Sequence, residues 1–269
     1  MPSDPGTVRR ALIDEAASAL SLGGVEAPRR EALRIWSDVS SEGEAMFQSA
    51  IRRRSAGEPL AHVTGRAGFR YLELASDRRA LIPRPETEGL VELLLAVSRT
   101  GSVADVGTGS GCIALSLAQE GTYSQVIGTD ISAEALALAG VNRDRCAGRV
   151  SLVRGDLGGP LRTGAFDALV SNPPYLTAQE YATLDPSVRD WEPRQALVGG
   201  TDGLETIARL LDEGRDVVRT GGWLALEVDC FRAAQCAGLA GALGWTDVAV
   251  HTDLFGRERY LLARRSHTQ

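Results

Sequence analysis

Short apolar runs and amphipathic stretches alternate along the chain from about residue 102 onward. Runs with the character of buried strands lie at 102–106, 125–129, 150–154, 166–172 and 223–228, and two further strands are predicted at 247–252 and 259–263. Helical periodicity separates them, over 112–119, 133–142, 204–218 and 231–243. Because strands and helices alternate, the pattern predicts an α/β fold built on a largely parallel sheet.

The first 56 residues show helical spacing of apolar side chains without intervening strands. Short amphipathic helices are predicted over 7–22, 28–38 and 43–54. Helices of this length are marginal by themselves, so we expect them to pack together as a small bundle. The pattern therefore predicts an N-terminal helical domain over residues 1–56.

Residues 57–88 have a third character. Short apolar or aromatic pieces lie between turn residues, which favours a β-hairpin linker between two domains. The prolines before Thr87 stiffen the chain, and Arg84 and Glu86 on this segment are candidates to line a site. A helix is expected from about Thr87, and the main domain would span 89–269.

The run that begins at Phe166 stops at the tetrapeptide Asn172-Pro173-Pro174-Tyr175. Proline has no N–H to donate to a central ladder, so the tetrapeptide should lie just past the carboxyl end of its strand. Ligands of open α/β sheets bind at that edge. The Asn172 side chain and the Pro173 backbone offer carbonyl acceptors beside the aromatic ring of Tyr175, an arrangement suited to a planar –NH2 group. The same residues are equally compatible with a simple turn that ends a strand.

A glycine-rich loop follows the first strand of the main domain. Its residues are Gly107, Thr108, Gly109, Ser110 and Gly111. Glycines let the backbone approach a ligand closely, and the following helix offers free N–H groups at its start. Asp130 ends the next strand, about 20 residues further on, where a contact to a ribose hydroxyl is expected. A glycine loop with an acid serves nicotinamide cofactors and S-adenosylmethionine alike, but the spacing after Asp105 favours the methyl donor.

Composition excludes several classes of chemistry. All 29 basic residues are arginine, so a lysine Schiff base and a Walker-type phosphate loop are excluded. The four cysteines form no Cys-x-x-Cys pair, and no metal site is expected. The net charge of −6 argues against bulk nucleic-acid binding, and no apolar run approaches the ~20 residues of a membrane span. The first ten residues lack the apolar core of a signal peptide, so a cytoplasmic location is expected, and the tail over 264–269 is predicted to be disordered.

Taken together and in order, these motifs resemble those of a known protein family. The matching elements are Gly57 to Ala61, Phe69, Ile82 to Glu88, Asp105 to Gly111, Asn172 to Tyr175, Glu192-Pro193 and Gly199 to Leu204. The chain resembles the bacterial release-factor glutamine N5-methyltransferases, the HemK/PrmC family, over about residues 55–263. It departs from the family pattern at Asp229 and Arg232, where glycine and glutamine are common, and at His62, where tyrosine is usual.

The resemblance implies a seven-stranded Rossmann-like class I methyltransferase sheet with its last strand antiparallel, and an N-terminal helical domain that recognises the substrate. It implies S-adenosylmethionine as methyl donor, S-adenosylhomocysteine as product, and the glutamine of the Gly-Gly-Gln loop of class I peptide-chain release factors as acceptor. By motif match, Gly107 to Gly111, Asp130, Asp156, Leu157 and Asn172 would contact the donor. Asn172 to Tyr175 would hold the glutamine, and no direct contact with nucleic acid or membrane is implied.

The expected chemistry is methyl transfer to an amide nitrogen, with Asn172 and Pro173 as the catalytic residues. Their two carbonyl groups would accept the two hydrogens of the amide and orient its nitrogen. An exocyclic amine of adenine or guanine presents similar hydrogens. A nucleic-acid amino-methyltransferase is therefore the alternative interpretation, against which the negative charge argues.

Overall fold

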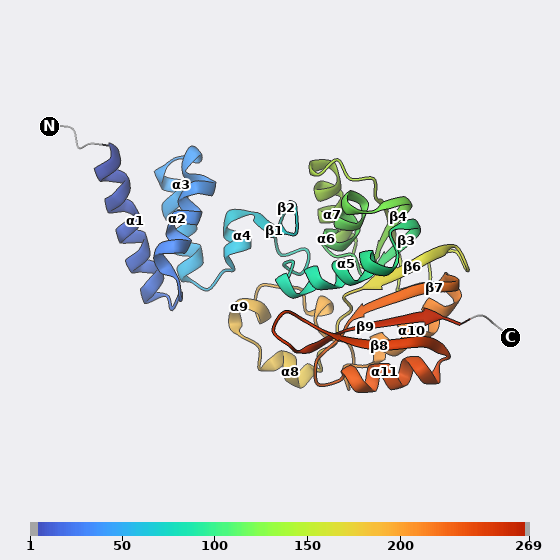
Figure 1. The fold of residues 1–269 in the computed structure, drawn as a ribbon. Coiled ribbons are helices and arrows are strands. Elements are labelled where there is room, and N and C mark those ends of the chain that lie inside the picture. Colours follow the sequence, from blue (N-terminus) through green and yellow to red (C-terminus); the bar gives the residue numbers. More distant parts are fainter. Residues whose placement is uncertain (1–4, 267–269) are drawn as a thin grey trace. The chain divides into compact units, whose positions relative to one another are not determined.

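The computed structural model describes residues 5–266. The chain forms two compact units (Figure 1). Unit 1 comprises the residues up to Arg66 together with Asp185–Trp191, and unit 2 comprises Ala67–Leu184 and the chain from Glu192 onward. Each unit has a hydrophobic core of its own.

Unit 1 is a small helical bundle. Its helices are α1 (Pro5–Leu22), α2 (Pro28–Val39), α3 (Glu44–Ser55), α4 (Leu60–Thr64) and α9 (Pro186–Arg189), with a 3-10 turn η1 (Ser40–Glu42). The apolar stripes of α1, α2 and α3 meet in a core centred on Leu20, Ile35 and Phe47, each at most 1% exposed. The three N-terminal helices predicted from the sequence are thus confirmed.

The segment predicted as a hairpin contains more than a hairpin. Strands β1 (Arg66–Phe69) and β2 (Leu72–Ala75) form a two-stranded sheet, as predicted. Residues Leu60–Thr64 are helical instead, because the chain coils after Pro59 and the carbonyl of that residue accepts the first hydrogen bonds of α4. Gly65, with φ of 68°, ends this helix in the left-handed conformation that favours glycine.

Unit 2 is built on a seven-stranded sheet with the order β5-β4-β3-β6-β7-β9-β8. Its strands are β3 (Thr100–Val106), β4 (Thr122–Asp130), β5 (Ser151–Arg154), β6 (Phe166–Ser171), β7 (Val218–Glu227), β8 (Trp245–Thr252) and β9 (Glu258–Arg265). The strands from β3 to β7 pair in parallel, and β9, the last in sequence, lies antiparallel between β7 and β8. The predicted seven-stranded sheet with an antiparallel last strand is confirmed.

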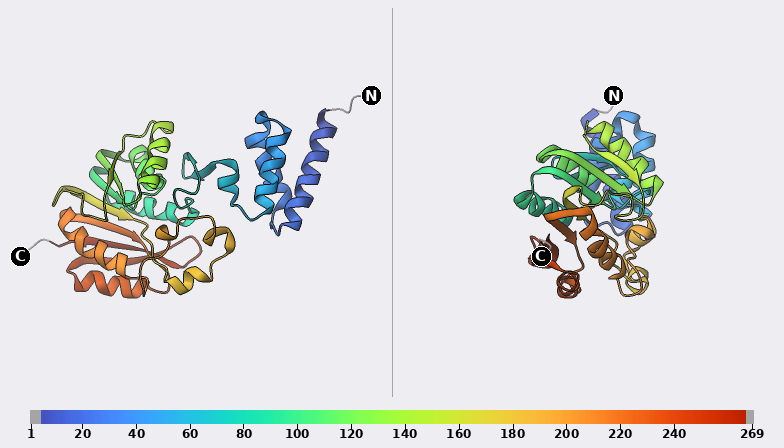
Figure 2. Two further views of the ribbon diagram at one scale, coloured as in Figure 1. Left: turned by 180° about the vertical axis from the view of Figure 1, so that it is seen from behind. Right: turned by 90° about the vertical axis from the view of Figure 1, so that its right-hand side faces the viewer.

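Helices cover both faces of this sheet (Figures 1 and 2). One face carries α5 (Pro85–Val97), α6 (Cys112–Glu120) and α7 (Ala133–Arg145), and the other carries α10 (Glu205–Val217) and α11 (Ala233–Ala242). Successive strand residues point to opposite faces, so Val170 of β6 packs in the core under α5 and α6, while Leu169 packs under α10 and α11. Short helices α8 (Ala178–Ala182) and η2 (Arg194–Ala196) lie in the connection from β6 to α10.

The C-terminal tail differs from its prediction. Strand β9 continues through Arg265, because the backbone of Arg264 pairs with Trp223 and that of Arg265 pairs with Trp245. The prediction of a disordered tail is therefore wrong for these two residues, and residues 267–269 lie outside the described part of the chain. Among the helices of residues 5–266, none combines the length and apolarity needed to cross a membrane.

Two glycines inside helices allow a matched test of the packing. At Gly89 in α5, an added Cβ would lie 2.3 Å from the hydroxyl oxygen of Tyr260, whose ring is buried on β9. We expect Gly89→Ala to destabilise the protein by about 1–3 kcal/mol through overpacking, although alanine is the better helix former. Thermal and denaturant unfolding would measure the change.

The control is Gly238→Ala in α11, where an added Cβ meets no atom within 4 Å among the described residues. Here the same substitution should stabilise by about 0.5–1 kcal/mol, because only the helix propensity changes. A Gly89→Ala protein that gains stability like the control would contradict the close contact between α5 and β9.

Candidate active site

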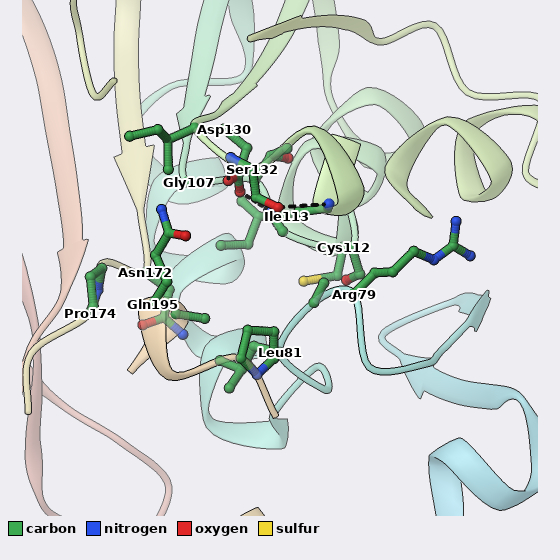
Figure 3. Close-up of a pocket in the computed structure, with 18 of the residues that line it drawn as sticks. Arg79, Leu81, Gly107, Cys112, Ile113, Asp130, Ser132, Asn172, Pro174 and Gln195 are labelled. Atoms are coloured by element: carbon green, nitrogen blue, oxygen red, sulfur yellow. Dashed lines mark hydrogen bonds between the residues drawn. The ribbon is translucent and has the colours of Figure 1, made fainter. Parts of the chain in front are cut away.

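A cavity of about 280 Å³ opens at the carboxyl ends of the parallel strands. Its lining residues all belong to unit 2, and Figure 3 shows many of them. They include most of the predicted ligand residues: Gly107, Thr108, Gly109, Ser110, Asp130, Asp156, Leu157, Asn172 and Pro174. Because parallel strands end at one edge, residues distant in sequence converge there.

The glycine loop between β3 and α6 follows a path that requires glycine. Gly107, Gly109 and Gly111 have φ values of 71°, 54° and 84°, which strain any residue with a Cβ. The Thr108 N–H donates to the carbonyl of Thr129 on β4 at 2.8 Å, and the buried Asn142 side chain donates to the carbonyl of Ser110 at 2.9 Å. The loop is therefore held in one shape, with its backbone along the cavity. Gly111 itself does not line the cavity and instead immediately precedes α6 as its N-cap.

Asp105 lies beneath this loop and is fully buried. Its Oδ2 accepts hydrogen bonds from the Thr108 hydroxyl at 2.6 Å and from the Ala114 N–H at 3.1 Å. Burial raises the pKa of this carboxyl to about 7, against the opposing effect of those hydrogen bonds. The Oδ1 atom has no hydrogen-bond partner among the described residues.

Asp130 and Asp156 place carboxylates at the cavity wall. Asp130 accepts from the Gly109 N–H and the Ser132 N–H, both at 2.9 Å, and each oxygen keeps a lone pair for a further donor. Asp156 pairs with Arg209 at 2.9 Å, and both side chains are about half exposed. In Figure 3, Asn172 and Gln195 lie at one end of the cavity, and Cys112 and Arg79 at the other.

The tetrapeptide after β6 contributes unequally to the cavity. Asn172 and Pro174 line it, whereas the Pro173 side chain is buried outside the lining and Tyr175 packs against the core under α10 and α11. Burial raises the pKa of the Tyr175 phenol well above its usual value, so this ring is neutral. The Asn172 Nδ2 donates to the Thr87 hydroxyl at 3.1 Å, which leaves its Oδ1 available to another donor.

A second glycine-rich loop packs directly on the backbone of the tetrapeptide. An added Cβ at Gly199 would lie 2.1 Å from the carbonyl oxygen of Pro174, and one at Gly203 would lie 2.4 Å from that of Tyr175. The Gly199 N–H donates to the carbonyl of Leu176 at 2.9 Å. This close approach explains the glycines of the 199–204 motif, whose role the sequence alone did not reveal.

Several lining residues were not singled out from the sequence, among them Arg79, Leu81, Ser132, Gln195, Val198, Thr206 and Arg209. The Glu192-Pro193 motif in the sequence indicates the segment that contains one of them, Gln195. The Glu192 carboxylate is buried, accepts from the Ile82 N–H at 3.0 Å and pairs with Arg84 at 2.5 Å. This pair fixes the stiff segment before α5 against the chain that leads to Gln195.

Two of the departures from the family pattern, Asp229 and Arg232, form a cluster of their own. Arg232 pairs with Glu180 of α8 at 2.7 Å and donates to the carbonyl of Asp202 at 2.9 Å. Asp229 lies 3.5 Å from the same guanidinium. The two unusual residues therefore hold α8 and the 199–204 loop to the start of α11.

The fold and the site define a class of protein. The fold is similar to that of a methyltransferase from Pyrococcus furiosus, with a TM-score of 0.56 and 21% identity over 82% of this chain and 98% of that chain. It is also similar to ribosomal protein L11 methylase from Lactobacillus delbrueckii subsp. bulgaricus, with a TM-score of 0.51 and 21% identity over 70% and 82% of the two chains. Residues 85–185 match the methyltransferase small domain. The chain is a methyltransferase with a Rossmann-like sheet.

Sequence relatives narrow the class to a family. The chain is 38% identical to the release factor glutamine methyltransferase of Deinococcus radiodurans over 96% of its length and 98% of the relative. It is 40% identical to that of Moorella thermoacetica over 96% and 99%, and 42% identical to that of Nitratidesulfovibrio vulgaris over 83% and 78%. The chain belongs to the release factor glutamine methyltransferase family, as the resemblance of its motifs indicated.

The buried Asp105 should make stability depend on pH. Its pKa of about 7 in the folded protein exceeds the value of 3.8 for an exposed aspartate, so the folded state binds the proton more tightly. The free energy of unfolding should consequently fall as the pH rises from about 4 to 7. In Asp105→Asn this decline should be smaller, and denaturant midpoints measured across that range would show it.

We expect the decline in unfolding free energy that remains in the variant to come from Glu227. Burial also raises the pKa of that carboxyl, to about 7. A matched control is Asp212→Asn on α10, an exposed aspartate outside the cavity lining, which should leave the pH dependence almost unchanged. An Asp105→Asn protein with the wild-type slope would show that Asp105 is ionised throughout the range.

Proposed function

We propose that this chain transfers a methyl group from S-adenosylmethionine to the side-chain amide nitrogen, N5, of the glutamine in the Gly-Gly-Gln loop of class I peptide-chain release factors. The family and the name of its relatives support the acceptor. The proposed chemistry rests on the Asn172 side chain. It lines the cavity, and its carbonyl oxygen is available to accept a hydrogen bond. Release factors work with the ribosome, so the proposed place of action is the cytoplasm.

The groups that line the cavity fit S-adenosylmethionine. The strained glycine loop lines the wall with backbone in place of side chains, and Asp130 has lone pairs for ribose hydroxyls. We propose that S-adenosylmethionine is bound by Gly107, Thr108, Gly109, Ser110, Gly111, Asp130, Asp156, Leu157 and Asn172. The Asp130 and Asp156 carboxylates also suit a ligand with net positive charge.

S-adenosylmethionine supplies an electrophilic methyl group when bound. An amide nitrogen is a poor nucleophile, because its lone pair is delocalised into the carbonyl. In the proposed mechanism, Asn172 Oδ1 and the Pro173 carbonyl accept the two amide hydrogens and turn the nitrogen toward the methyl group. The two acceptors also stabilise positive charge that develops on the nitrogen as the N–C bond forms and the S–C bond breaks. The sulfur leaves as S-adenosylhomocysteine, and the methylated amide returns to neutrality by losing one of its two N–H hydrogens to solvent as a proton. Pro174 and Tyr175 complete the proposed glutamine site, since Pro174 stiffens the backbone and Tyr175 anchors it in the core.

Asn172→Ala tests this mechanism. The variant removes one acceptor and leaves the glycine loop and Asp130 intact, so turnover should fall by roughly 100-fold or more. Donor binding, measured by calorimetry, should persist with at most a moderate loss. The reaction is followed by mass spectrometry of a co-incubated release factor, in which the wild type should add one methyl group to the Gly-Gly-Gln glutamine.

Two outcomes of this experiment would count against the proposal. Turnover by Asn172→Ala at the wild-type rate would remove Asn172 from the mechanism. In a parallel incubation with labelled methyl donor and either release factor or nucleic acid, label that appears only in RNA or DNA would favour the nucleic-acid amino-methyltransferase instead.

We further propose that unit 1 recognises the release factor. A single glutamine offers little contact area, so a protein substrate needs additional surface for specificity. All residues that line the cavity lie in unit 2, which leaves unit 1 available for this role. The helical domain expected over 1–56 is the larger part of that unit.

A chain that begins at Ala67, the first residue of unit 2, should keep donor binding and lose most activity on intact release factor. This start retains Phe69 and Leu74, which are buried in the core of unit 2. Donor affinity and methylation should be measured on the same sample, so that misfolding is recognised by lost donor binding. Full activity of the shortened chain would mean that unit 1 does not recognise the substrate.

A further inference from the structure

The Asn172 amide is held by a hydrogen-bonded chain that begins outside the tetrapeptide. Its Nδ2 donates to Thr87 Oγ1 at 3.1 Å, and that hydroxyl lies 2.7 Å from Glu227 Oε2. Thr87 is in the first turn of α5, and Glu227 is the last residue of β7. Both residues are 2% exposed, so water does not compete for their hydrogen bonds.

The number of hydrogens available fixes which group donates and which accepts in each of these hydrogen bonds. A hydroxyl has one hydrogen, and an ionised carboxylate can only accept. Because Glu227 accepts the hydrogen of Thr87, the Thr87 oxygen can only accept from Asn172. The Asn172 amide must then present its NH2 to Thr87. An amide turned by 180° would place its carbonyl oxygen against the Thr87 oxygen with no hydrogen between them.

The Thr87 hydroxyl and Arg259 offset part of the effect of burial on Glu227. Arg259 Nη1 of β9 lies 3.9 Å from Glu227 Oε1, and Arg259 is itself anchored to Asp253 at 3.0 Å. Burial raises the pKa of Glu227, while the Thr87 hydroxyl and Arg259 act in the opposite direction. Above pH 7 the ionised Glu227 carboxylate has no hydrogen to give, so it is a fixed acceptor for the Thr87 hydroxyl.

We propose that Thr87 and Glu227 are positioning residues that fix the carbonyl oxygen of Asn172 as the group facing the substrate amide. Glu227 lies outside the cavity lining and Thr87 belongs to it, and both act on the reaction through the orientation of Asn172. The inference rests on the proposed function, because it assigns the freed oxygen to the glutamine amide. It adds that the catalytic orientation depends on residues from α5 and β7, far in sequence from the tetrapeptide.

Thr87→Val tests the proposal, since valine keeps the shape of threonine and removes the hydroxyl. Without a fixed acceptor, the Asn172 amide can adopt either orientation, so kcat for release factor should fall roughly 10-fold to 100-fold. The dissociation constant of the methyl donor, measured by calorimetry, should change less than about 3-fold. Thr87→Ser restores the hydroxyl and should recover most of kcat.

Thr246→Val on β8 is the matched control, because its hydroxyl donates to the carbonyl of Arg264, and neither residue lines the cavity. It should leave kcat unchanged. Glu227→Gln keeps the volume of the side chain but allows it to donate as well as accept, so the direction of the chain is no longer fixed. This variant should also lower kcat by about 10-fold above pH 7, where the wild-type Glu227 is ionised.

The outcomes separate this inference from the proposed function. A wild type that adds no methyl group to the release factor refutes the proposed function itself. An active wild type with Thr87→Val equally active refutes the positioning role. Equal loss of kcat in Thr87→Val and Thr87→Ser would also refute it, because the hydroxyl would then not be the group that matters.

Discussion

A single buried carboxylate joins the elements from which the cavity is built. Asp105 is the penultimate residue of β3 and accepts hydrogen bonds from both the Thr108 hydroxyl in the glycine loop and the Ala114 N–H in the first turn of α6. Burying a carboxyl costs free energy unless hydrogen bonds or protonation offset it, so the loop that satisfies Asp105 is the favoured one. The positions of the glycine loop and of Asp130, which accepts from Gly109, follow from this arrangement.

Most of the fold could be predicted because it follows from local patterns. The buried strands of unit 2 are short continuous apolar runs, and their helices carry one apolar face, so element type and order follow from periodicity. The errors lie where tertiary contacts override the local pattern. Helix α4 is too short for periodicity to reveal it, and Val218, predicted to end a helix, begins β7 because it pairs with Phe166 of β6.

The site was predictable to the extent that its residues follow strands. Asp130, Asp156 and Asn172 each come just after or at the end of a parallel strand, and such ends meet at one edge. Thr87 and Glu227 could not be paired in this way, because 140 residues separate them and neither belongs to a motif with a fixed spacing to the other. The same applies to the pair formed by half-buried Arg84 and buried Glu192.

The segment Asp185–Trp191 belongs to unit 1, although it follows the tetrapeptide by only a short stretch of unit 2. The chain thus leaves unit 2 after Leu184 and returns to it at Glu192. During synthesis, unit 1 lacks one of its pieces until the ribosome has passed Trp191, so it cannot be completed as an independent N-terminal domain before the sheet begins to form. For the same reason, recombination between relatives that exchanged only the residues before Ala67 would combine a bundle from one protein with a segment from another.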